Sequence, residues 1–564
     1  MVFKTKEEEI AYELKRIRTQ FAKCDVPAAY DVLKQEEVML PMPDGVRLRT
    51  LIYLPNRAGP FPTVVVRTCY PKNEAVSRVL AEEYACRGFC YVIQYCRGTG
   101  GSEGVWEPNV NERSDGKCTI DWVCAQPFVG NVGCAGNSYL ALTGWVIADI
   151  VPEQVKTMYL THYGLFRYVS AYQDGMFRHD VLTAWAMENA GFPVSADYLE
   201  SCAYRPQETV DEDLWGQRVD WYRDWVTSCD EDDDYWNTGL WGQFKEIPGR
   251  VKIPLYIGEG WYDHHLQSAI ETYRNLSEES RRHSTFLIGA WDHNFNSALD
   301  DRTAENLEND NVLRCFRWLY DILVREEMPQ PQIAAYIIGD DRWHYRREYE
   351  IPRQAYKRFY FSGRQQSGTY SLSENVGTNL GEVSYVYDPN NPVKTYGAES
   401  CLHSKELRGS LRQQKPGFRN DVISFISDPI EEPFTTAGAI SATLEVSSDA
   451  EDTAFVVKII EEMANGKAYH VRSSITTLGY RGHSKKRIPY RPGEKVSINI
   501  RMWDLTWKFQ RGSRVRVDVT SSNFPEYSIH SNFPGGWAKI KNCKTARQTV
   551  YFGGNSSYIE FPLL

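Results

Sequence analysis

Three polar residues, Ser138, Asp263 and His293, occur in settings typical of a nucleophile, an acid and a base. Ser138 follows an apolar, strand-like run and the small residue Gly136, and a helix-like run comes after it. A serine projected from a strained strand-to-helix turn needs small neighbours, so this string is typical of a nucleophile elbow. Leu140 stands where the familiar pattern has a second glycine, and the string taken alone favours a buried serine in a glycine turn.

Asp263 and His293 each follow a short apolar run that ends in glycine, at residues 254–258 and 285–289. Such runs are typical of buried strands, and residues 265–280 between them have helical spacing. The segment is therefore predicted to form one parallel strand-helix-strand unit, with both side chains on adjacent loops at one sheet edge. Ligands and catalytic residues collect at the carboxyl ends of parallel strands.

The chain order serine, aspartate, histidine is that of the α/β-hydrolases. In this chemistry His293 takes the proton from Ser138 as the serine attacks an acyl carbonyl, and Asp263 orients the imidazole and stabilises its cation. Asp292 and Glu259 are alternative orienters. Asp292 adjoins His293 in the chain and is poorly placed to reach its ring, and Glu259 precedes the Trp-Tyr turn before Asp263.

Several short segments run in the same order as in a known family: Pro43-Asp44-Gly45-Val46-Arg47-Leu48, Arg87-Gly88-Phe89, Arg97-Gly98, Ser102-Glu103-Gly104, Asp121-Trp122, Gln126-Pro127, Gly136-Asn137-Ser138-Tyr139, Gly260-Trp261-Tyr262-Asp263, Gly289-Ala290-Trp291-Asp292-His293 and Arg419-Asn420-Asp421-Val422. They resemble the cocaine esterase and X-prolyl dipeptidyl-peptidase family of serine hydrolases, which also holds the α-amino-acid ester hydrolases. The likeness runs from about residue 36 to the C-terminal part. Cys69, Tyr95 and Ala141 depart from the residues usual in the family.

The resemblance implies an α/β fold: an α/β-hydrolase core with an inserted helical cap and a C-terminal jelly-roll β-sandwich. The oxyanion of the tetrahedral intermediate needs two hydrogen-bond donors. We expect one to be the backbone N–H of Tyr139, the residue after the nucleophile. The resemblance implies the phenol of Tyr70 as the second donor. A phenol with a pKa of about 10 stays protonated at neutral pH and can therefore donate a hydrogen bond. The alternative for Tyr70 is a surface tyrosine in the turn before Pro71.

Composition limits the classes of partner and compartment. The chain has 564 residues, 42% hydrophobic and 24% charged, which predicts roughly three to four globular domains. A net charge of −10 argues against nucleic acid or an anionic membrane as a partner. The thirteen cysteines lack Cys-x-x-Cys or zinc-ligand spacing, and residues 1–9 lack the apolar core of a signal peptide. We therefore expect reduced thiols in a cytoplasmic protein.

The first half of the chain is predicted to hold an N-terminal helix and the catalytic core. Residues 1–30 contain an amphipathic helix over 6–22, which packs on the body of the protein or on another subunit, so a homo-oligomer is one expectation. Residues 31–162 and 251–330 are expected to form the α/β core, starting with a hairpin at Asp44-Gly45 and followed by strands near 63–67, 90–95, 131–135 and 155–162.

Two further parts are predicted from changes in pattern. Residues 163–250, here called the cap segment, have helical patterns and carry Trp185, Trp215, Trp221, Trp225, Trp236 and Trp241. Most of these tryptophans are expected to fill the cap segment's own core. Residues 331–564 are expected to form the β-sandwich, because apolar residues alternate with polar ones, as at Val515, Val517 and Val519.

Two groups of residues invite a metal hypothesis. The acidic run at residues 230–234 lacks the glycine and terminal glutamate of a calcium loop, so a solvated charge run is favoured. A narrower hypothesis is that one of its carboxylates binds a substrate ammonium. His264 and His265 have no third ligand placed by spacing. The sequence therefore predicts no metal and no cofactor.

We expect a serine hydrolase that cleaves carboxylic esters of small, apolar or aromatic compounds through an acyl-enzyme. An Xaa-Pro dipeptidyl peptidase, which needs a site for an N-terminal ammonium, is one alternative. An α-amino-acid ester or amide hydrolase is another. A non-catalytic binding protein that keeps the fold is the third, and the ordered triad argues against it.

Overall fold

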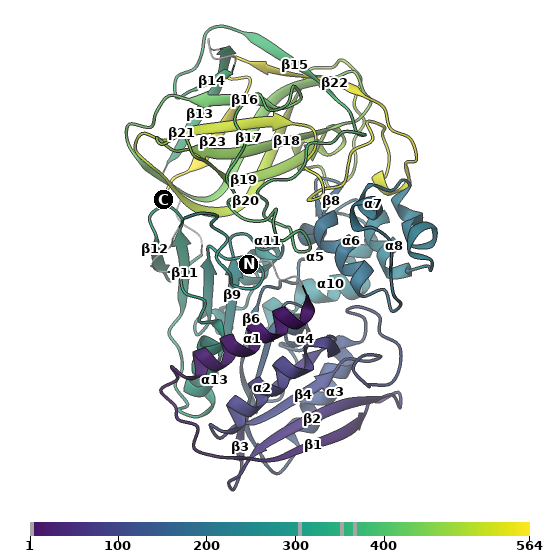
Figure 1. Cartoon of the computed structure of the whole chain (residues 1–564), viewed down its shortest axis with the longest axis vertical. Coiled ribbons are helices and arrows are strands. Elements are labelled where there is room, and N and C mark those ends of the chain that lie inside the picture. Colours follow the sequence, from purple (N-terminus) through teal and green to yellow (C-terminus); the bar gives the residue numbers. More distant parts are fainter. Residues whose placement is uncertain (1–4, 303–306, 350–354, 365–368) are drawn as a thin grey trace.

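The computed structural model of the chain describes residues 5–302, 307–349, 355–364 and 369–564. Residues 1–4 of the predicted N-terminal segment lie outside the described residues. Figure 1 shows three regions: an α/β region at the bottom, a helical region on the right and a β-rich region at the top. The predicted fold class, an α/β-hydrolase core with a C-terminal β-sandwich, is confirmed.

The α/β region is built on a ten-stranded sheet with the order β1-β2-β4-β3-β5-β6-β9-β10-β11-β12. Its central strands, from β4 to β11 in this order, run parallel, and an antiparallel pairing lies at each side. The strands are β1 (Val32–Pro41), β2 (Arg47–Pro55), β3 (Phe61–Thr68), β4 (Cys90–Tyr95), β5 (Val129–Asn137), β6 (Val155–Thr161), β9 (Leu255–Gly260), β10 (Thr285–Gly289), β11 (Gln332–Ile337) and β12 (Arg342–Arg346). The parallel run brings the carboxyl ends of β3, β5, β6, β9 and β10 to one edge.

Helices connect and cover these strands: α1 (Lys6–Phe21), η1 (Pro71–Asn73), α2 (Glu74–Ala85), α3 (Glu112–Cys124), α4 (Tyr139–Trp145), α11 (Leu266–Arg274), α12 (Glu278–Arg281) and α13 (Asn311–Leu323). The predicted N-terminal helix is α1, which lies beside α2 and α13 (Figure 1). Its Phe21 packs edge-on against the rings of Tyr84 and Phe316, at centroid distances of 5.9 and 5.5 Å. The apolar stripe of α1 is thus covered by the body of the protein itself.

The strands β11 and β12 correct one expectation from the sequence. The β-sandwich was predicted to begin at residue 331, but β11 pairs in parallel with β10 and β12 pairs with β11. Both strands extend the first sheet, and the strands of the C-terminal sheet begin at β13. Alternating apolar residues predict a strand but do not reveal its partner, which is why the sequence assigned these strands to the wrong sheet.

The cap segment is mainly helical and also carries a two-stranded hairpin. Its elements are α5 (Arg167–Ala171), β7 (Tyr172–Gln173), β8 (Met176–Phe177), α6 (His179–Glu188), α7 (Tyr198–Ala203), η2 (Gln207–Thr209), η3 (Asp211–Trp215), α8 (Asp220–Thr227), α9 (Asp234–Asn237), α10 (Gly239–Glu246) and η4 (Pro248–Arg250). Four of the six tryptophans are at most 5% exposed, and Trp185 and Trp221 are half-buried. Most of the indoles therefore fill the interior, as expected.

The C-terminal part is an eleven-stranded β structure. Its elements are β13 (Tyr356–Arg364), β14 (Tyr370–Ser373), β15 (Gly381–Tyr387), β16 (Ile423–Ser427), β17 (Phe434–Ser448), β18 (Ala454–Glu462), β19 (Ala468–Thr477), η5 (Leu478–His483), β20 (Val496–Phe509), β21 (Arg514–Thr520), η6 (Trp537–Lys539), β22 (Ala546–Phe552) and β23 (Tyr558–Pro562). The alternating residues Val515, Val517 and Val519 lie in β21 and are fully buried.

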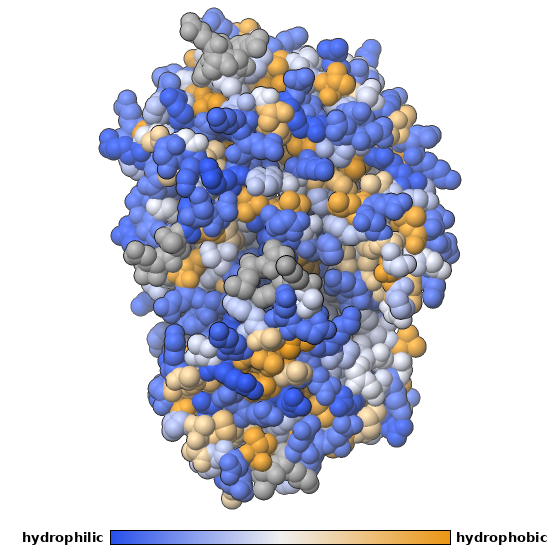
Figure 2. Space-filling model, viewed as in Figure 1, coloured by the Kyte–Doolittle hydropathy of each residue, from blue (hydrophilic) through white to orange (hydrophobic). Residues whose placement is uncertain are grey.

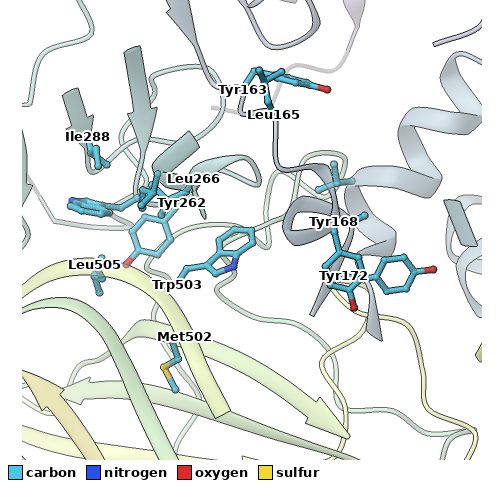
Figure 3. Close-up of a cluster of buried hydrophobic side chains, with 14 of the residues drawn as sticks. Tyr163, Leu165, Tyr168, Tyr172, Tyr262, Leu266, Ile288, Met502, Trp503 and Leu505 are labelled. Atoms are coloured by element: carbon cyan, nitrogen blue, oxygen red, sulfur yellow. The ribbon is translucent and has the colours of Figure 1, made fainter. Parts of the chain in front are cut away.

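One continuous core joins the three regions. Figure 3 shows Tyr262 and Leu266 of the α/β region close to Trp503 of β20, with Tyr168 and Tyr172 of the cap segment nearby. All five belong to a single cluster of buried hydrophobic side chains. The regions are therefore held together by burial of apolar surface, which is the dominant stabilising term in protein folding.

The outer surface contrasts with this core. The face shown in Figure 2 is mainly hydrophilic, and its apolar residues form small groups. Among the helices of the described residues, none combines the length and the apolar character needed to span a bilayer.

Candidate active site

Ser138 sits at a tight turn between β5 and α4. Its backbone has φ +58° and ψ −127°, a conformation that L-residues rarely adopt. A Cβ atom at Gly136 would lie 2.1 Å from the carbonyl oxygen of Leu140, so only glycine fits beneath this turn. The Ser138 N–H donates to the carbonyl of Thr161 on the neighbouring β6. The turn thus projects a half-exposed hydroxyl above the sheet edge.

The predicted Asp263 and His293 meet Ser138 at this edge. The loop after β9 carries Asp263 and the loop after β10 carries His293. The His293 Nε2 atom is 2.9 Å from Ser138 Oγ, and its Nδ1 atom is 2.5 Å from Asp263 Oδ2. The three side chains form one continuous hydrogen-bonded series. This is the spatial arrangement in which a serine is activated by a histidine.

Asp263 is fully buried, and its charge is stabilised by imidazoles. Burial alone would raise the pKa of its carboxyl, but His293, together with His264 and His162, holds the pKa well below its usual value. A carboxylate that stays ionised at neutral pH can hold His293 by Nδ1 and stabilise an imidazolium.

Tyr139 presents its backbone N–H at the first position of α4. The first N–H groups of a helix have no carbonyl partner within it, so this N–H is available to an anion beside Ser138. The Tyr139 hydroxyl donates to Glu112 Oε1 at 3.0 Å and accepts from the N–H of Asn109 at 2.8 Å. These bonds fix the side chain and with it the start of α4.

Tyr70 follows β3 at the same edge, 6.4 Å from Tyr139 between ring centroids. Its hydroxyl accepts a hydrogen bond of 3.2 Å from the indole Nε1 of Trp185. Burial raises the pKa of Tyr70 well above its usual value, so the phenol keeps its proton at neutral pH. Tyr70 is half-buried in the protein interior and therefore differs from the surface tyrosine considered as its alternative.

The two alternative orienters lie elsewhere in the hydrogen-bond network. Asp292 forms an ion pair of 2.6 Å with Arg408 and accepts from the N–H groups of its own loop. Glu259 is fully buried under the loop of Asp263, and burial, together with the charge of Asp263, raises its pKa well above the usual range. Glu259 is therefore a neutral carboxylic acid, which cannot stabilise an imidazolium as a carboxylate does.

Three further histidines surround the triad. The ring of His264 is 4.3 Å from that of His293, and the ring of His162 is 5.3 Å from it. His265 packs on His264 at 4.3 Å. Burial lowers the pKa of all three, that of His162 to about 3, so they are neutral at physiological pH. His162 was not predicted from the sequence, although its place at the end of the predicted strand at 155–162 could have indicated it.

Possible metal donors coincide with the triad. Among the described residues, donor atoms of Asp263, His264 and His293 lie within 4.8 Å of one another, as do those of His162, Glu259 and Asp263. In the first group Asp263 and His293 already bond to each other. In the second group Glu259 is a neutral acid, which is a poor metal ligand. We therefore assign no metal to this cluster.

The acidic run at 230–234 is occupied by contacts with the C-terminal part. Tyr480 donates its hydroxyl to Asp230 at 2.5 Å. Glu231 pairs with Lys485 at 3.2 Å and Asp232 with Lys486 at 2.9 Å. Asp233 accepts from a backbone N–H at the start of α9. These carboxylates bind the neighbouring region, and the hypothesis of an ammonium site gains no support from them.

Aromatic side chains of the cap segment pack against the residues next to Ser138. Trp185 stacks on Tyr139 at 6.2 Å with an interplanar angle of 15°, and it contacts Trp106, Trp221 and Trp225 at 5.6 to 5.8 Å. The same indole donates to the Tyr70 hydroxyl, so one cap side chain contacts both residues that are expected to supply oxyanion donors. Nothing in the sequence distinguishes Trp185 from the other five tryptophans of the cap segment.

Comparisons with known proteins identify a family of hydrolases. Residues 44–294 match the X-Pro dipeptidyl-peptidase (S15 family) model, and residues 326–560 match that of the X-Pro dipeptidyl-peptidase C-terminal non-catalytic domain. The chain is 27% identical to the cocaine esterase of Rhodococcus sp. (strain MB1 Bresler), over 93% of this chain and 98% of that protein.

Solved structures share the fold over the same length. An aminopeptidase from a marine sediment Thaumarchaeota archaeon superimposes with a TM-score of 0.79 at 20% identity, covering 95% of this chain and 97% of that one. An α-amino acid ester hydrolase superimposes with a TM-score of 0.78 at 22% identity, with the same coverage. The two matched models together span most of the sequence, and the chain belongs to the X-Pro dipeptidyl-peptidase and cocaine esterase family of α/β-hydrolase serine hydrolases.

Proposed function

We propose that this enzyme hydrolyses carboxylic esters with Ser138 as its nucleophile. The observation that carries the proposal is the hydrogen-bonded series from Ser138 Oγ through His293 to Asp263, with distances of 2.9 and 2.5 Å. A serine hydroxyl is a weak nucleophile at its free pKa, and a base in hydrogen-bond contact activates it.

The reaction proceeds in two stages. His293 takes the Ser138 proton as Oγ attacks the ester carbonyl, and Asp263 stabilises the imidazolium. The Tyr139 N–H and the Tyr70 hydroxyl donate to the oxyanion. His293 then gives the proton to the departing alcohol, which leaves an acyl-enzyme on Ser138. A water molecule, deprotonated by the same imidazole, releases the carboxylic acid and restores the hydroxyl.

Small apolar or aromatic esters are the proposed substrates. The indoles of Trp185, Trp221 and Trp225 give the approach to Ser138 an aromatic lining. The similarity to a protein named cocaine esterase supports ester substrates. An Xaa-Pro dipeptidyl peptidase is the second candidate, favoured by the S15 model over 44–294. That reaction has to hold a desolvated ammonium, and the acidic run is engaged by Tyr480, Lys485 and Lys486 instead.

Labelling with a fluorophosphonate tests the nucleophile. We expect one label per chain, at Ser138, because only an activated hydroxyl reacts with this probe. The variant Ser138→Ala should lose both labelling and turnover while keeping its melting temperature within a few degrees. Peptide mapping that placed the label on another residue, or full activity of the alanine variant, would remove the proposal.

A substrate panel tests esterase against peptidase activity. We expect kcat/KM for phenyl acetate and a benzoyl ester to exceed that for Gly-Pro-nitroanilide. All three substrates are measured with the wild type and with Ser138→Ala, which corrects for spontaneous hydrolysis. A clear preference for the anilide would reverse the ranking in favour of the dipeptidyl peptidase.

A further inference from the structure

Arg167 is a buried cation without an anionic partner. The side chain lies at the start of α5 in the cap segment, and the residue is only 8% exposed. Within the described residues its Nε atom is buried without a hydrogen-bond partner, and no carboxylate forms an ion pair with its guanidinium. Other buried arginines are paired, such as Arg67 with Glu112 at 2.8 Å and Arg408 with Asp292 at 2.6 Å.

The guanidinium of Arg167 contacts an indole of the cap segment and acts on two histidines next to the triad. On one side its Cζ is 5.1 Å from the ring of Trp225, which contacts Trp185, the residue that bonds Tyr70. On the other side its charge acts on His264 and His265. Burial is the main cause of their low pKa, and the Arg167 cation lowers the pKa of both further.

The histidines on which Arg167 acts are linked to the triad and to α5. His264 stacks 4.3 Å from His293, and Ser170, one turn after Arg167 in α5, lies 3.4 Å from His265 through its hydroxyl. Two chains of contacts thus connect the surroundings of Arg167 with the triad, one through Trp225 and Trp185 and one through the histidines.

Burying a guanidinium without an anionic partner costs free energy, and a bound anion can offset this cost. A guanidinium is charged at every physiological pH and carries five N–H donors. Removing it from water without an acceptor is unfavourable, and a cation–π contact offsets only part of that cost. A planar carboxylate matches the donors of a guanidinium in a bidentate manner.

We infer that the Arg167 guanidinium binds a carboxylate group of the substrate, so that the preferred esters carry an anionic group beside their aromatic or apolar part. This inference rests on the proposed ester hydrolysis at Ser138. It adds a second recognition element to the aromatic lining, and it opposes substrates with a free ammonium, because like charges repel in a desolvated site.

Matched pairs of esters test the inference. Mono-4-nitrophenyl glutarate is compared with 4-nitrophenyl pentanoate, which varies the acyl side, and 4-acetoxybenzoate with 4-acetoxybenzamide, which varies the alcohol side. In at least one pair the wild type should favour the anionic ester by about ten- to hundredfold in kcat/KM, the usual worth of a charged hydrogen bond. In the Arg167→Gln variant the ratio of kcat/KM between the anionic and the neutral member of that pair should fall to about one.

Two further variants control for charge and for folding. Arg167→Lys retains the cation and should retain part of the preference. Arg218→Gln removes a cation from an exposed position of the same segment, 56% exposed, and should change neither pair. Loss of activity on both members of a pair in Arg167→Gln indicates a structural role and overturns the inference.

Measurements on the wild-type enzyme distinguish the proposed carboxylate site from the proposed ester hydrolysis. Hydrolysis of the neutral esters without any preference for the anionic ones overturns the carboxylate site and leaves the ester hydrolase intact. Absence of hydrolysis for all four esters, together with cleavage of Gly-Pro-nitroanilide, overturns the esterase proposal itself.

Discussion

An indole of the cap segment holds the hydroxyl of Tyr70. Trp185 donates to it from the cap segment, and burial keeps the phenol protonated, so its own proton can be directed to an oxyanion. Such a donor acts mainly in the transition state, where the negative charge develops.

Tyr70→Phe should therefore lower kcat by about 10²- to 10³-fold, the usual loss for one oxyanion donor, with little change in KM. Steady-state kinetics on phenyl acetate check this expectation. The control is Tyr204→Phe, whose hydroxyl bonds Asp213 on the outside of the cap segment. A kcat within a few-fold of the wild type would mean that another group supplies the second donor.

Glu259 holds a proton in the folded protein. Its pKa is raised, so above the pKa of an unfolded glutamate the native state binds a proton that the unfolded state releases. The free energy of unfolding then falls as pH rises, by up to about 1.4 kcal/mol per pH unit, until the pH passes the native pKa.

The Glu259→Gln variant removes this titration while keeping the shape of the side chain. We expect the difference in melting temperature between variant and wild type to increase in favour of the variant from pH 5 to pH 8. Glu153→Gln, at an exposed position, is the control and should show no such trend. The opposite slope would mean that Glu259 is ionised in the native state.

The site residues that could be predicted are those whose neighbours in the sequence indicate where they lie in the fold. Ser138, Asp263 and His293 each follow a buried strand, and the parallel order brings strand ends together. Trp185 and Arg167 lie on helices of the cap segment, where helical spacing gives no position relative to the sheet. Their contacts depend on tertiary packing, which a single sequence does not contain.

The elbow is the element on which the site depends most. Gly136 lies in β5, where a Cβ would overlap the backbone of Leu140, and the following helix begins directly after Ser138. The departure of Leu140 from the familiar second glycine is tolerated, because its side chain packs among residues of a buried cluster.

Gly136→Ala should lower the free energy of unfolding by about 3 kcal/mol and abolish labelling of Ser138, because the backbone of the turn has to shift. Differential scanning fluorimetry and fluorophosphonate labelling measure the two effects. The matched control is Gly249→Ala, where the nearest atom to an added Cβ is 3.7 Å away. A stable and fully labelled Gly136→Ala variant would show that the turn adapts.

Elements were predicted well where their pattern is local. The expected strands at 63–67, 90–95 and 155–162 correspond to β3, β4 and β6, and the expected N-terminal helix corresponds to α1. The partner of a strand is a non-local property, and β11 was accordingly placed in the wrong sheet. The other predicted domain boundaries remain predictions.

At the scale of the whole molecule, the C-terminal part supports the loop that carries Asp263. Arg472 of β19 is fully buried and donates to the carbonyls of Trp261 at 2.6 Å and Asp504 at 2.7 Å. Its guanidinium also lies 5.3 Å from the ring of Tyr262. Trp261 and Tyr262 directly precede Asp263, so β19 holds the backbone that presents the catalytic acid.

Arg472→Met keeps the length of the side chain and leaves both carbonyls without this donor. We expect a lower melting temperature and a kcat that falls more than KM rises, since each buried group left unpaired costs about 1–3 kcal/mol. Arg511→Met, at a position 65% exposed, is the control and should leave both quantities unchanged. A normal kcat in Arg472→Met would show that the loop keeps its shape without this support.

The contact between Trp261 and Arg472 also bears on the order of events during synthesis of the chain. The two residues are 211 positions apart in the chain. At a synthesis rate of about 5–20 residues per second, roughly 10 to 40 s pass between their emergence from the ribosome. A nascent polypeptide that already contains Ser138, Asp263 and His293 therefore lacks the Arg472 contact behind its catalytic acid until β19 has been synthesised.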